Sequence, residues 1–317
     1  MNERTYTRKE LKDLFDGKQV SPYLDFSFEE GDDFNIIGNL SISGVQEKYS
    51  TLVEDGKIRL AHKGEQGTHI LKPAPIAKIS DRKEIPANEH LTMHLASEVY
   101  GLNTARNAVC FTADNQLVYI TRRFDVQSEG RKYSQEDFSV LTHLVGGKGG
   151  NFKYEGSYED IAVAIKQNIA SWPIAMDEFF RLVVFNYIFA NGDAHLKNFS
   201  VLIQDGETSL SPAYDLINTA MHVGGDDLAL KNGLSLRLEK SDVYEQTKHL
   251  CKTDFECFGK LIGMPSSRIK RTIERFSTFP QEVYDLIENS YLRTDKLKRK
   301  YIKIIEERRM RFIRESE

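Results

Sequence analysis

The sequence has 317 residues, 28% of them charged and 40% hydrophobic, which is long enough for a substantial core and ordinary for a soluble globular protein. Its net charge of −4 gives no reason to expect non-specific binding to nucleic acid, and we expect no direct contact with DNA. The cysteines are too few and too scattered for a disulfide framework or a four-ligand zinc site; they are Cys110, Cys251 and Cys257.

The start of the chain and the length of its hydrophobic runs indicate the cellular compartment of the protein. Residues 1–10 are highly charged and lead into no apolar run of signal-peptide length. We find no stretch of about 18 apolar residues, the length needed to cross a bilayer. The cysteine usage also fits a reducing compartment. We therefore expect a soluble, cytoplasmic protein with no membrane partner.

The first half of the chain mixes strand and helix signals. Residues 68–72 (THILK) end at Pro73, and residues 117–124 (LVYITRRF) are rich in β-branched and aromatic side chains, so both predict strands. The residues between them predict a helix, because apolar side chains recur at helical spacing after Pro86 and before a glycine. These side chains are Leu91, Leu95, Val99 and Leu102.

The glycine-rich segment 146–151 (GGKGGN) is the most flexible-looking part of the sequence. Its glycines could cradle a phosphate, but no strand leads into it and its lysine is not placed as in a P-loop, which favours a mobile connecting loop. We expect a boundary between two lobes before it. We place the N-terminal lobe at residues 1–135 and a mostly helical C-terminal lobe at 136–317.

The second half begins with a strongly apolar helix signal. Residues 178–189 are apolar nearly all round, which predicts a helix buried in the middle of a domain. The loop 191–198 (NGDAHLKN) follows, and then two short strands joined by Asp205-Gly206 predict a hairpin. The last helix carries an apolar stripe, and the arginines near its end (Arg308, Arg309, Arg311 and Arg314) indicate a solvated face rather than a site for an acidic partner.

Three polar side chains in this half point to chemistry. Asp193 and Asn198 stand five residues apart after the buried helix, and Asp215 follows the hairpin. Phosphoryl transfer from ATP needs such a set, because one carboxylate orients the attacking hydroxyl while an amide and a second carboxylate hold Mg²⁺ against the phosphates. The order of helix, loop, hairpin and second acid favours this interpretation over a solvated polar loop.

Two further residues of the loop are open to more than one interpretation. His195 forms an Asp-Ala-His pattern with Asp193, but no second motif with ligand spacing supports a metal hydrolase. A role for His195 in shaping the loop through hydrogen bonds fits better. Lys197 either steadies the transferring phosphate or faces solvent.

Other parts of a nucleotide site occur upstream in the order found in kinases. Lys72 ends a predicted strand, where its ammonium group could reach the α- and β-phosphates. Glu89 lies in the first turn of the following helix and could pair with it. Residues 41–50 (SISGVQEKYS) could form a loop over the phosphates, although a single glycine is a weak signal.

Seven segments together resemble the HipA-like serine/threonine kinase toxins and follow one another in the family's order. They are SGVQEK (43–48), THILKP (68–73), NEHLTMHLA (88–96), RRFD (122–125), SQEDF (134–138), NGDAHLKNFS (191–200) and SPAYDL (211–216). The resemblance covers residues 40–220 and implies an α+β, bilobal protein-kinase-like fold. The last hundred residues resemble the family's helical domain only in a general way.

The resemblance also implies roles for individual residues. Asp193 would be the catalytic base, with Asn198 and Asp215 as the Mg²⁺ ligands. Lys72 would bind the phosphates of ATP, and the backbone from Arg122 to Phe124 would be the hinge beside the adenine. Asp125 would lie near the ribose. The other residues around the bound ATP would be Glu89, His195 and Lys197.

The resemblance also implies a substrate and antitoxin partners. The substrate would be a protein, with aminoacyl-tRNA synthetases the known class, and its phosphorylation would arrest growth. Only about 40 residues precede the SGVQEK segment, where full-length members have an extra N-terminal subdomain. This resembles the short HipT branch of tripartite toxin–antitoxin systems, so we expect a small antitoxin in place of that subdomain, and a DNA-binding antitoxin is a further candidate partner.

The family is regulated by autophosphorylation of a serine in the loop before the first strand. This sequence has two hydroxyls there, Ser41 and Ser43. A phosphoserine adds nearly two negative charges, which beside the phosphates of ATP would repel the nucleotide or displace the loop. We expect self-modification of one or both to switch the enzyme off.

Two alternatives remain, one another phosphotransferase and one a non-catalytic module. A small-molecule phosphotransferase of the aminoglycoside or choline kinase type shares a stretch similar to NGDAHLKN, but the SGVQEK and SQEDF segments and Tyr214 before Asp215 do not belong to that pattern. A non-catalytic kinase-fold module of a repressor complex would have no need for an intact set of Lys72, Asp193, Asn198 and Asp215.

Overall fold

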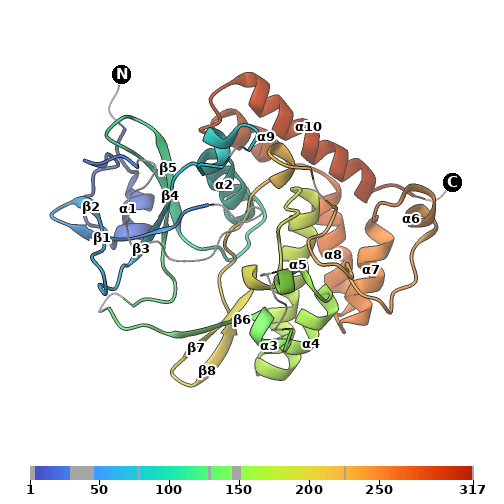
Figure 1. Cartoon of the computed structure of the whole chain (residues 1–317). Coiled ribbons are helices and arrows are strands. Elements are labelled where there is room, and N and C mark those ends of the chain that lie inside the picture. The colour runs from blue at the N-terminus through green and yellow to red at the C-terminus, as the bar shows by residue number, and fades with distance from the viewer. Residues whose placement is uncertain are drawn as a thin grey trace.

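The computed structural model of the chain describes residues 4–28, 46–77, 79–127, 130–144, 151–224 and 226–315. It has the expected α+β architecture. A sheet-containing lobe is built from the first part of the chain and a mostly helical lobe from the rest (Figure 1). The phosphate-loop residues Ser41 and Ser43 and most of the glycine-rich segment 146–151 lie outside the described residues.

The N-terminal lobe contains a five-stranded antiparallel sheet with the strand order β2-β1-β3-β5-β4. Asp55 and Gly56 both have positive φ, as a tight two-residue hairpin turn requires, and they join the first two strands. The strands predicted at 68–72 and 117–124 are confirmed as β3 and β5. The bounds are β1 (Tyr49–Glu54), β2 (Lys57–Leu60), β3 (His69–Lys72), β4 (Asn107–Phe111) and β5 (Leu117–Arg122).

Two helices pack beside this sheet (Figure 1). Helix α1 (Arg8–Phe15) begins at a capping box in which the Thr7 hydroxyl accepts from Glu10 N, and its Leu14 and Phe15 are buried in one core with strand residues. Helix α2 (Ile85–His94) continues directly into the π-helical turn η2 (Leu95–Val99). The predicted helix between the strands is thus confirmed, with a π turn that its apolar spacing did not indicate.

The C-terminal lobe is organised around α5 (Trp172–Ile188), whose side chains are buried on nearly every face, as its all-round apolar pattern predicts. The helices around it are α3 (Phe138–Leu141), α4 (Tyr158–Asn168), α6 (Asp242–Thr247), α7 (Lys252–Leu261), α8 (Ser266–Ser277), α9 (Gln281–Glu288) and α10 (Asp295–Phe312). Short 3₁₀ turns occur at η1 (Arg82–Glu84), η3 (Asn151–Tyr154), η4 (Leu196–Asn198) and η5 (Thr219–Met221).

A second, three-stranded sheet lies in the helical lobe. Strand β6 (Ser134–Asp137) pairs with β7 (Ser200–Gln204), which forms the predicted hairpin with β8 (Glu207–Leu210). Asp205 and Gly206 make the hairpin turn with φ of 51° and 86°. The expected lobe boundary at 135/136 falls inside β6, all four residues of which pair with β7 of the helical lobe.

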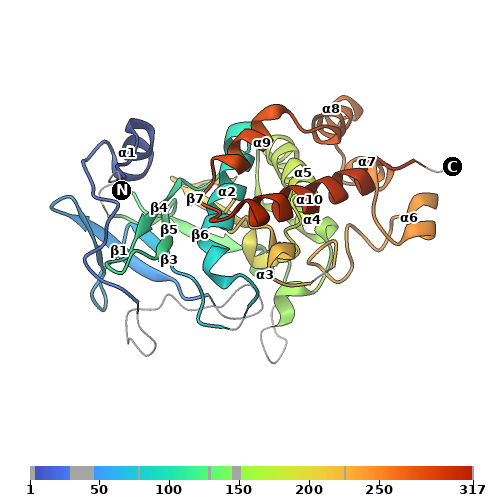
Figure 2. The ribbon, with the colours of Figure 1, turned by 90° about the horizontal axis from the view of Figure 1, so that it is seen from above.

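The two lobes are joined through α2. Figure 2 shows α10 running past this helix, and the buried hydroxyls of Thr92 and Tyr301 lie 2.9 Å apart between them. Glu84 beside α2 forms an ion pair with Arg293, which precedes α10. Because α2 carries Glu89, these contacts fix a candidate site residue relative to the helical lobe.

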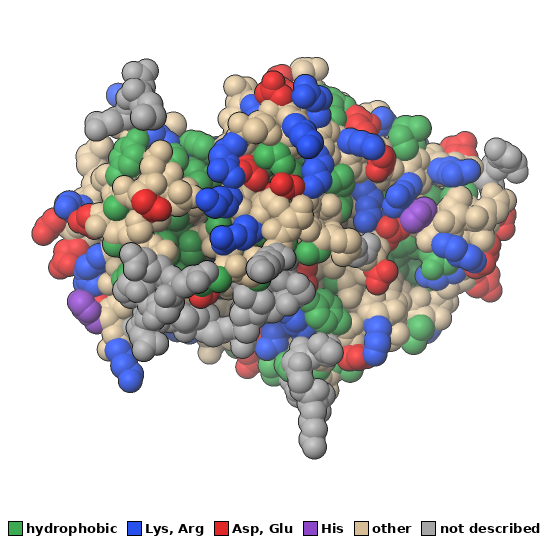
Figure 3. Space-filling view, turned by 45° about the horizontal axis from the view of Figure 1, so that its top comes forward, with side chains coloured by type: hydrophobic (Ala, Val, Ile, Leu, Met, Phe, Trp, Pro, Cys, Tyr) green, Lys and Arg blue, Asp and Glu red, His purple; other side chains and the backbone are tan. Residues whose placement is uncertain are grey.

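The charged surface is mixed. On the face drawn in Figure 3, Lys and Arg side chains gather near the middle with Asp and Glu side chains among them. Arg308, which was expected on a solvated helix face, is instead buried and pairs with Asp227, because α10 packs on that loop. Within the described ranges, no helix is long and apolar enough to cross a membrane.

Candidate active site

A buried ion-pair chain links the lobes at the site. Lys72, the last residue of β3, places its ammonium group between the carboxylates of Glu89 on α2 and Asp215 after β8, with a short contact to each. The side chains of Lys72 and Glu89 are each only 3% exposed. Burial opposes the charge on Lys72, but the carboxylates of Asp215 and Glu89 overcome it and raise its pKa. The lysine therefore stays charged at a place that water does not reach.

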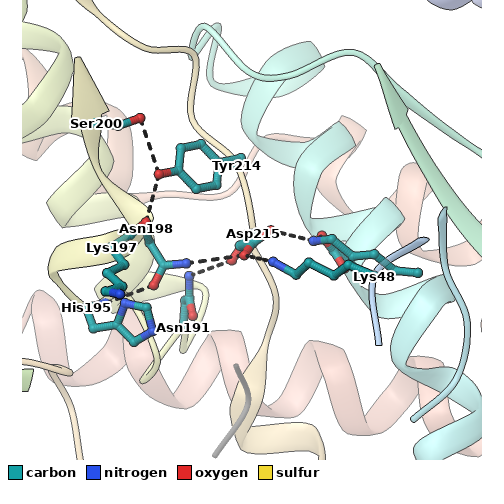
Figure 4. A network of polar contacts seen from close by, with 10 residues as sticks. Lys48, Asn191, His195, Lys197, Asn198, Ser200, Tyr214 and Asp215 are labelled. Carbon is teal, nitrogen blue, oxygen red and sulfur yellow. Dashed lines mark hydrogen bonds and ion pairs between the residues drawn. The ribbon is translucent and has the colours of Figure 1, made fainter. Parts of the chain in front are cut away.

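Asp215 is the centre of the contacts in Figure 4. Its Oδ2 accepts a hydrogen bond of 2.8 Å from Lys48 Nζ and lies 3.5 Å from Nδ2 of Asn198. Burial alone would raise the pKa of this carboxyl, but Lys48 and Lys72 hold it far below its ordinary value. Its backbone is in the left-handed region, with φ of 57°, which turns the chain sharply after Tyr214.

The loop after α5 is held by side chains from several elements. The Tyr158 hydroxyl donates to the carbonyl of Ala194 at 2.8 Å, and Gly192 N donates to Thr219 Oγ1 at 2.9 Å. His195 N donates to Asn198 Oδ1 at 3.1 Å, which orients the amide of Asn198 from within the loop. The loop is thus a fixed support for the side chains that it carries.

Asp193 projects from this loop beside η3. Its Oδ1 accepts a hydrogen bond of 2.6 Å from the Tyr154 hydroxyl. The charges of both Asp193 and Asp215 act on the neighbouring Lys153, whose pKa is lowered by burial. Both acids that the sequence analysis singled out therefore lie within electrostatic range of Lys153.

His195 is buried beneath the loop. Neither ring nitrogen has a hydrogen-bond partner among the residues that the structure describes, and burial lowers the pKa of the ring to about 4. The edge of the ring faces Tyr154, with ring centroids 5.2 Å apart. His195 does shape the loop through hydrogen bonds, as expected, but it does so with its backbone.

Lys197 is half-buried rather than fully solvated. Its ammonium group lies over the Phe152 ring, 4.9 Å from the centroid. Its carbonyl accepts a hydrogen bond of 2.8 Å from the Tyr214 hydroxyl, which also lies 3.3 Å from Ser200 Oγ (Figure 4). The residue before Asp215 is thus tied to the loop that carries Asn198.

The expected hinge follows β5. The Arg122 guanidinium points to α1, where it donates to both carboxylate oxygens of Asp16 at 2.6 and 2.9 Å. The Phe124 ring lies 5.5 Å from the ring of Tyr214. Asp125 is buried and bound by Arg123 at 2.9 and 2.6 Å, and although burial raises its pKa, Arg123 lowers it overall. Only Phe124 of these side chains therefore contacts the residues around Asp215.

Two contacts in the site had no counterpart in the sequence analysis. Lys48, which binds Asp215, stands in the SGVQEK segment, and its charge within a candidate phosphate loop was a usable signal. Tyr154, which binds Asp193, had no such signal, since it lies 39 residues from its partner in a segment with no motif.

The donor set fits Mg²⁺ rather than a site for a transition metal. Within the described residues, no group of three or more His, Cys, Asp or Glu side chains lies close enough to hold a metal ion. Mg²⁺ in nucleotide sites needs only one or two protein oxygens, because water and phosphate oxygens complete its shell. Asp215 and Asn198, 3.5 Å apart, offer one carboxylate and one amide.

Comparison with known proteins shows which family the chain is similar to. The model of the HipA-like C-terminal domain matches residues 40–283. A Haemophilus influenzae protein named "Putative kinase" is 28% identical over 228 residues, which are 68% of this chain and 64% of that protein. A Sinorhizobium fredii protein named "Putative kinase Y4dM" is 30% identical over 252 residues, covering 74% of this chain and 58% of the relative. The chain thus spans between half and two thirds of the length of these curated relatives.

Solved structures agree on the fold. HipA of Shewanella oneidensis MR-1, solved with HipB and its operator DNA, superposes with a TM-score of 0.67 at 18% identity, over 98% of this chain and 71% of that one. The Helicobacter pylori proinflammatory kinase CtkA gives a TM-score of 0.57 at 14% identity, over 92% of this chain and 95% of that one. The fold is bilobal and kinase-like, and the chain belongs to the family of HipA-like C-terminal domains.

Proposed function

We propose that the chain is an ATP-dependent serine/threonine protein kinase that acts as the toxin of a toxin–antitoxin system. One observation carries the proposal: the buried ammonium group of Lys72 is held between Glu89 and Asp215, and Asp215 in turn meets Asn198. A strand lysine paired with a helix glutamate, next to a carboxylate and an amide suited to Mg²⁺, is the arrangement that kinases use to position ATP.

Charge at the site supports a nucleotide. Lys48 and Lys72 bind Asp215, and the charges of Asp193 and Asp215 act on Lys153, with Lys197 near it. The negative charge of a triphosphate with Mg²⁺ would complement these ammonium groups. When bound to Asn198 and Asp215, Mg²⁺ would supply charge neutralisation at the phosphates. The hinge backbone from Arg122 to Phe124 is the proposed contact for adenine, with Asp125 near the ribose.

The reaction assigned to the site is a single displacement. The oxygen of a serine or threonine hydroxyl attacks the γ-phosphorus, the bond to the β–γ bridging oxygen breaks, and ADP leaves with that electron pair. Asp193 orients the hydroxyl and takes its proton. Lys72 and Lys48 hold positive charge where the phosphates carry negative charge. Most of the acceleration would come from this positioning and electrostatics.

The proposed biological role rests on membership of the family. The structural relative from Shewanella was solved with HipB and operator DNA, which supports a DNA-binding antitoxin as partner here. We further propose a protein substrate of the aminoacyl-tRNA synthetase class, a small antitoxin in the manner of the HipT branch, and inactivation by autophosphorylation of Ser41 or Ser43. Mass spectrometry after incubation with Mg²⁺-ATP tests the last point, and absence of phosphate on both serines would refute it.

The decisive experiment compares the chain with Asp193→Asn. Asp205→Asn is the matched control, because Asp205 lies in the β7–β8 hairpin turn and Asn tolerates its positive φ. We expect phosphotransfer and growth arrest with the wild type and the control, and loss of both with Asp193→Asn. Phosphoproteomics after controlled expression would then identify the substrate. Label on small molecules but never on protein would favour the small-molecule phosphotransferase, and equal activity of Asp193→Asn would refute the assignment.

A further inference from the structure

A groove in the helical lobe lies beside the loop that carries Asp193. Its volume is about 880 Å³, and its near end is formed by Tyr154 and Gly192, the residues that contact and precede Asp193. Its remaining walls come from the segment 226–250 between β8 and α7. Lys48, Lys72 and Asp215 do not line it, so it is distinct from the candidate nucleotide site.

The floor of the groove is fixed to the elements around the site. Lys231 N donates to the carbonyl of Tyr154 at 2.9 Å, and Tyr158 N and Glu159 N donate to the carbonyls of Gly233 and Leu234 at 3.0 Å each. These hydrogen bonds attach the 231–234 stretch to η3 and the start of α4. The groove therefore has a defined position relative to the Asp193 carboxylate before any partner binds.

Leucines divide between the core and the groove. Leu230 and Leu234 are 3% and 1% exposed and anchor the segment. Leu236, two residues further on, lines the groove and is 77% exposed, more than any other large hydrophobic side chain in the described chain. Leu228 and Leu238 flank it at the groove wall, half-buried. An apolar side chain of a partner would cover Leu236.

More positively than negatively charged side chains line the groove. Three lysines line it, and their existing contacts are weak: Lys231 and Lys248 make exposed ion pairs with Glu155 and Glu245, and Lys240 lies over the Tyr244 ring at 4.8 Å.

The acidic side chains that line the groove compensate for the charge of these lysines only in part. Asp227 is already bound by Arg308, Arg311 and His249, so Asp226 remains as the exposed acid. An acidic partner complements this lining better than a basic one.

We propose that this groove binds an extended acidic segment of the protein substrate, which covers Leu236 with an apolar side chain and presents its serine or threonine hydroxyl to Asp193 in place of the Tyr154 phenol. The proposal rests on the proposed kinase function and names the sequence class that the enzyme recognises. Two groove features carry it: an exposed leucine and an excess of ammonium groups, both on a floor fixed beside the catalytic loop.

Binding tests the groove without catalysis. The probe is a fluorescein-labelled peptide with one serine, one leucine and flanking Asp and Glu, titrated by fluorescence anisotropy into the full Asp193→Asn chain. Adding Leu236→Ser or Lys240→Glu should weaken binding about tenfold each. The matched controls Ile174→Ser and Lys270→Glu, also exposed but outside the groove, should change nothing. No binding of the acidic peptide, or binding that is equal in all variants, would overturn the proposal.

Phosphorylation gives the second readout in the active chain. Peptides of the same design with Asp and Glu replaced by Lys should be poor substrates of the wild type and better substrates of Lys240→Glu, while the KM for ATP stays unchanged. If the peptides are phosphorylated equally well by the groove variants, the proposal that the groove binds the substrate is refuted, while the kinase function stands. Groove-dependent binding without any phosphotransfer would refute the kinase function alone.

Discussion

The hydroxyl of Tyr154 donates a hydrogen bond of 2.6 Å to Oδ1 of Asp193, so the proposed catalytic carboxylate is partly occupied in the free protein. Burial and this bond raise the pKa of the phenol, which therefore remains a donor at neutral pH. A substrate hydroxyl that approaches Asp193 must displace it or share the carboxylate with it. Tyr154 is therefore a positioning residue at the junction of the catalytic loop and the groove.

Tyr154→Phe should lower the KM for the acceptor peptide. The variant removes a hydrogen bond with a net value of about 1 kcal/mol that competes with the substrate, which corresponds to about a fivefold change. Steady-state kinetics with a serine peptide measures it, with the KM for ATP as the internal control. A fall in kcat with unchanged acceptor KM would show instead that the phenol orients the carboxylate for catalysis.

The ion-pair chain at Lys72 gives a prediction about stability. Lys72→Met leaves the Glu89 carboxylate buried without its partner, while Asp215 keeps Lys48. Breaking a buried pair on one side costs about 3–5 kcal/mol, so the variant should unfold at much lower urea concentration and lose ATP binding.

The double variant Lys72→Met/Glu89→Leu separates the two effects. It removes both buried charges of the pair, and we expect it to recover most of the stability without recovering activity. Urea denaturation followed by circular dichroism, alongside nucleotide binding, checks both. A single variant as stable as the wild type would mean that the pair is not buried in solution.

Much of the site could be predicted from sequence because its residues sit at the ends of regular elements. Lys72 ends a strand with a strong β signal, and Asp193 and Asn198 share one short loop after an apolar helix. Asp215 follows a hairpin marked by Asp-Gly. The order of such elements along the chain restricts where their ends can meet, so the convergence of Lys72, Glu89, Asn198 and Asp215 could be expected before the structure was known.

The other contacts join residues that are far apart in the sequence, and such contacts leave no local sequence pattern by which to predict them. The Lys48–Asp215 contact joins residues 167 positions apart, and nothing near Lys48 shows which acid it meets. The exposed Leu236 has the same alternation as the buried Leu230 and Leu234, so the spacing alone would assign all three to the core. The π turn after α2 similarly keeps the apolar spacing of an ordinary helix.

Gly192 shows how closely the catalytic loop is fitted. A Cβ at this position would lie 3.1 Å from the carbonyl oxygen of Asp226 and 3.3 Å from Thr219 Oγ1. Gly192→Ala should push the loop away from both and displace Asp193, lowering kcat about tenfold or more with the fold retained. Gly224→Ala is the control, since among the described residues other than its chain neighbours no atom lies within 4 Å of the added carbon. Equal kcat for the two variants would contradict the close fit.

Acid should destabilise the fold before its carboxylates are protonated. Burial lowers the pKa of five histidines, which are His69, His90, His94, His195 and His222. For His69 and His195 the value is about 4, against 6.5 for a free side chain. Between these two values the unfolded chain binds protons that the folded chain does not, so the free energy of unfolding falls as the pH falls, by up to about 1.4 kcal/mol per pH unit for each histidine.

The buried Glu89 and the half-buried Glu178 act in the opposite direction, because burial raises the pKa of both carboxyls and the folded chain binds their protons more readily. Five histidines outnumber them, so the urea midpoint should drop between pH 7 and pH 5. His195→Gln should flatten this dependence relative to the wild type, whereas His62→Gln, at an exposed position, should leave it unchanged. A midpoint that stays constant down to pH 5 would mean that these imidazoles titrate normally in the folded protein and are therefore not buried.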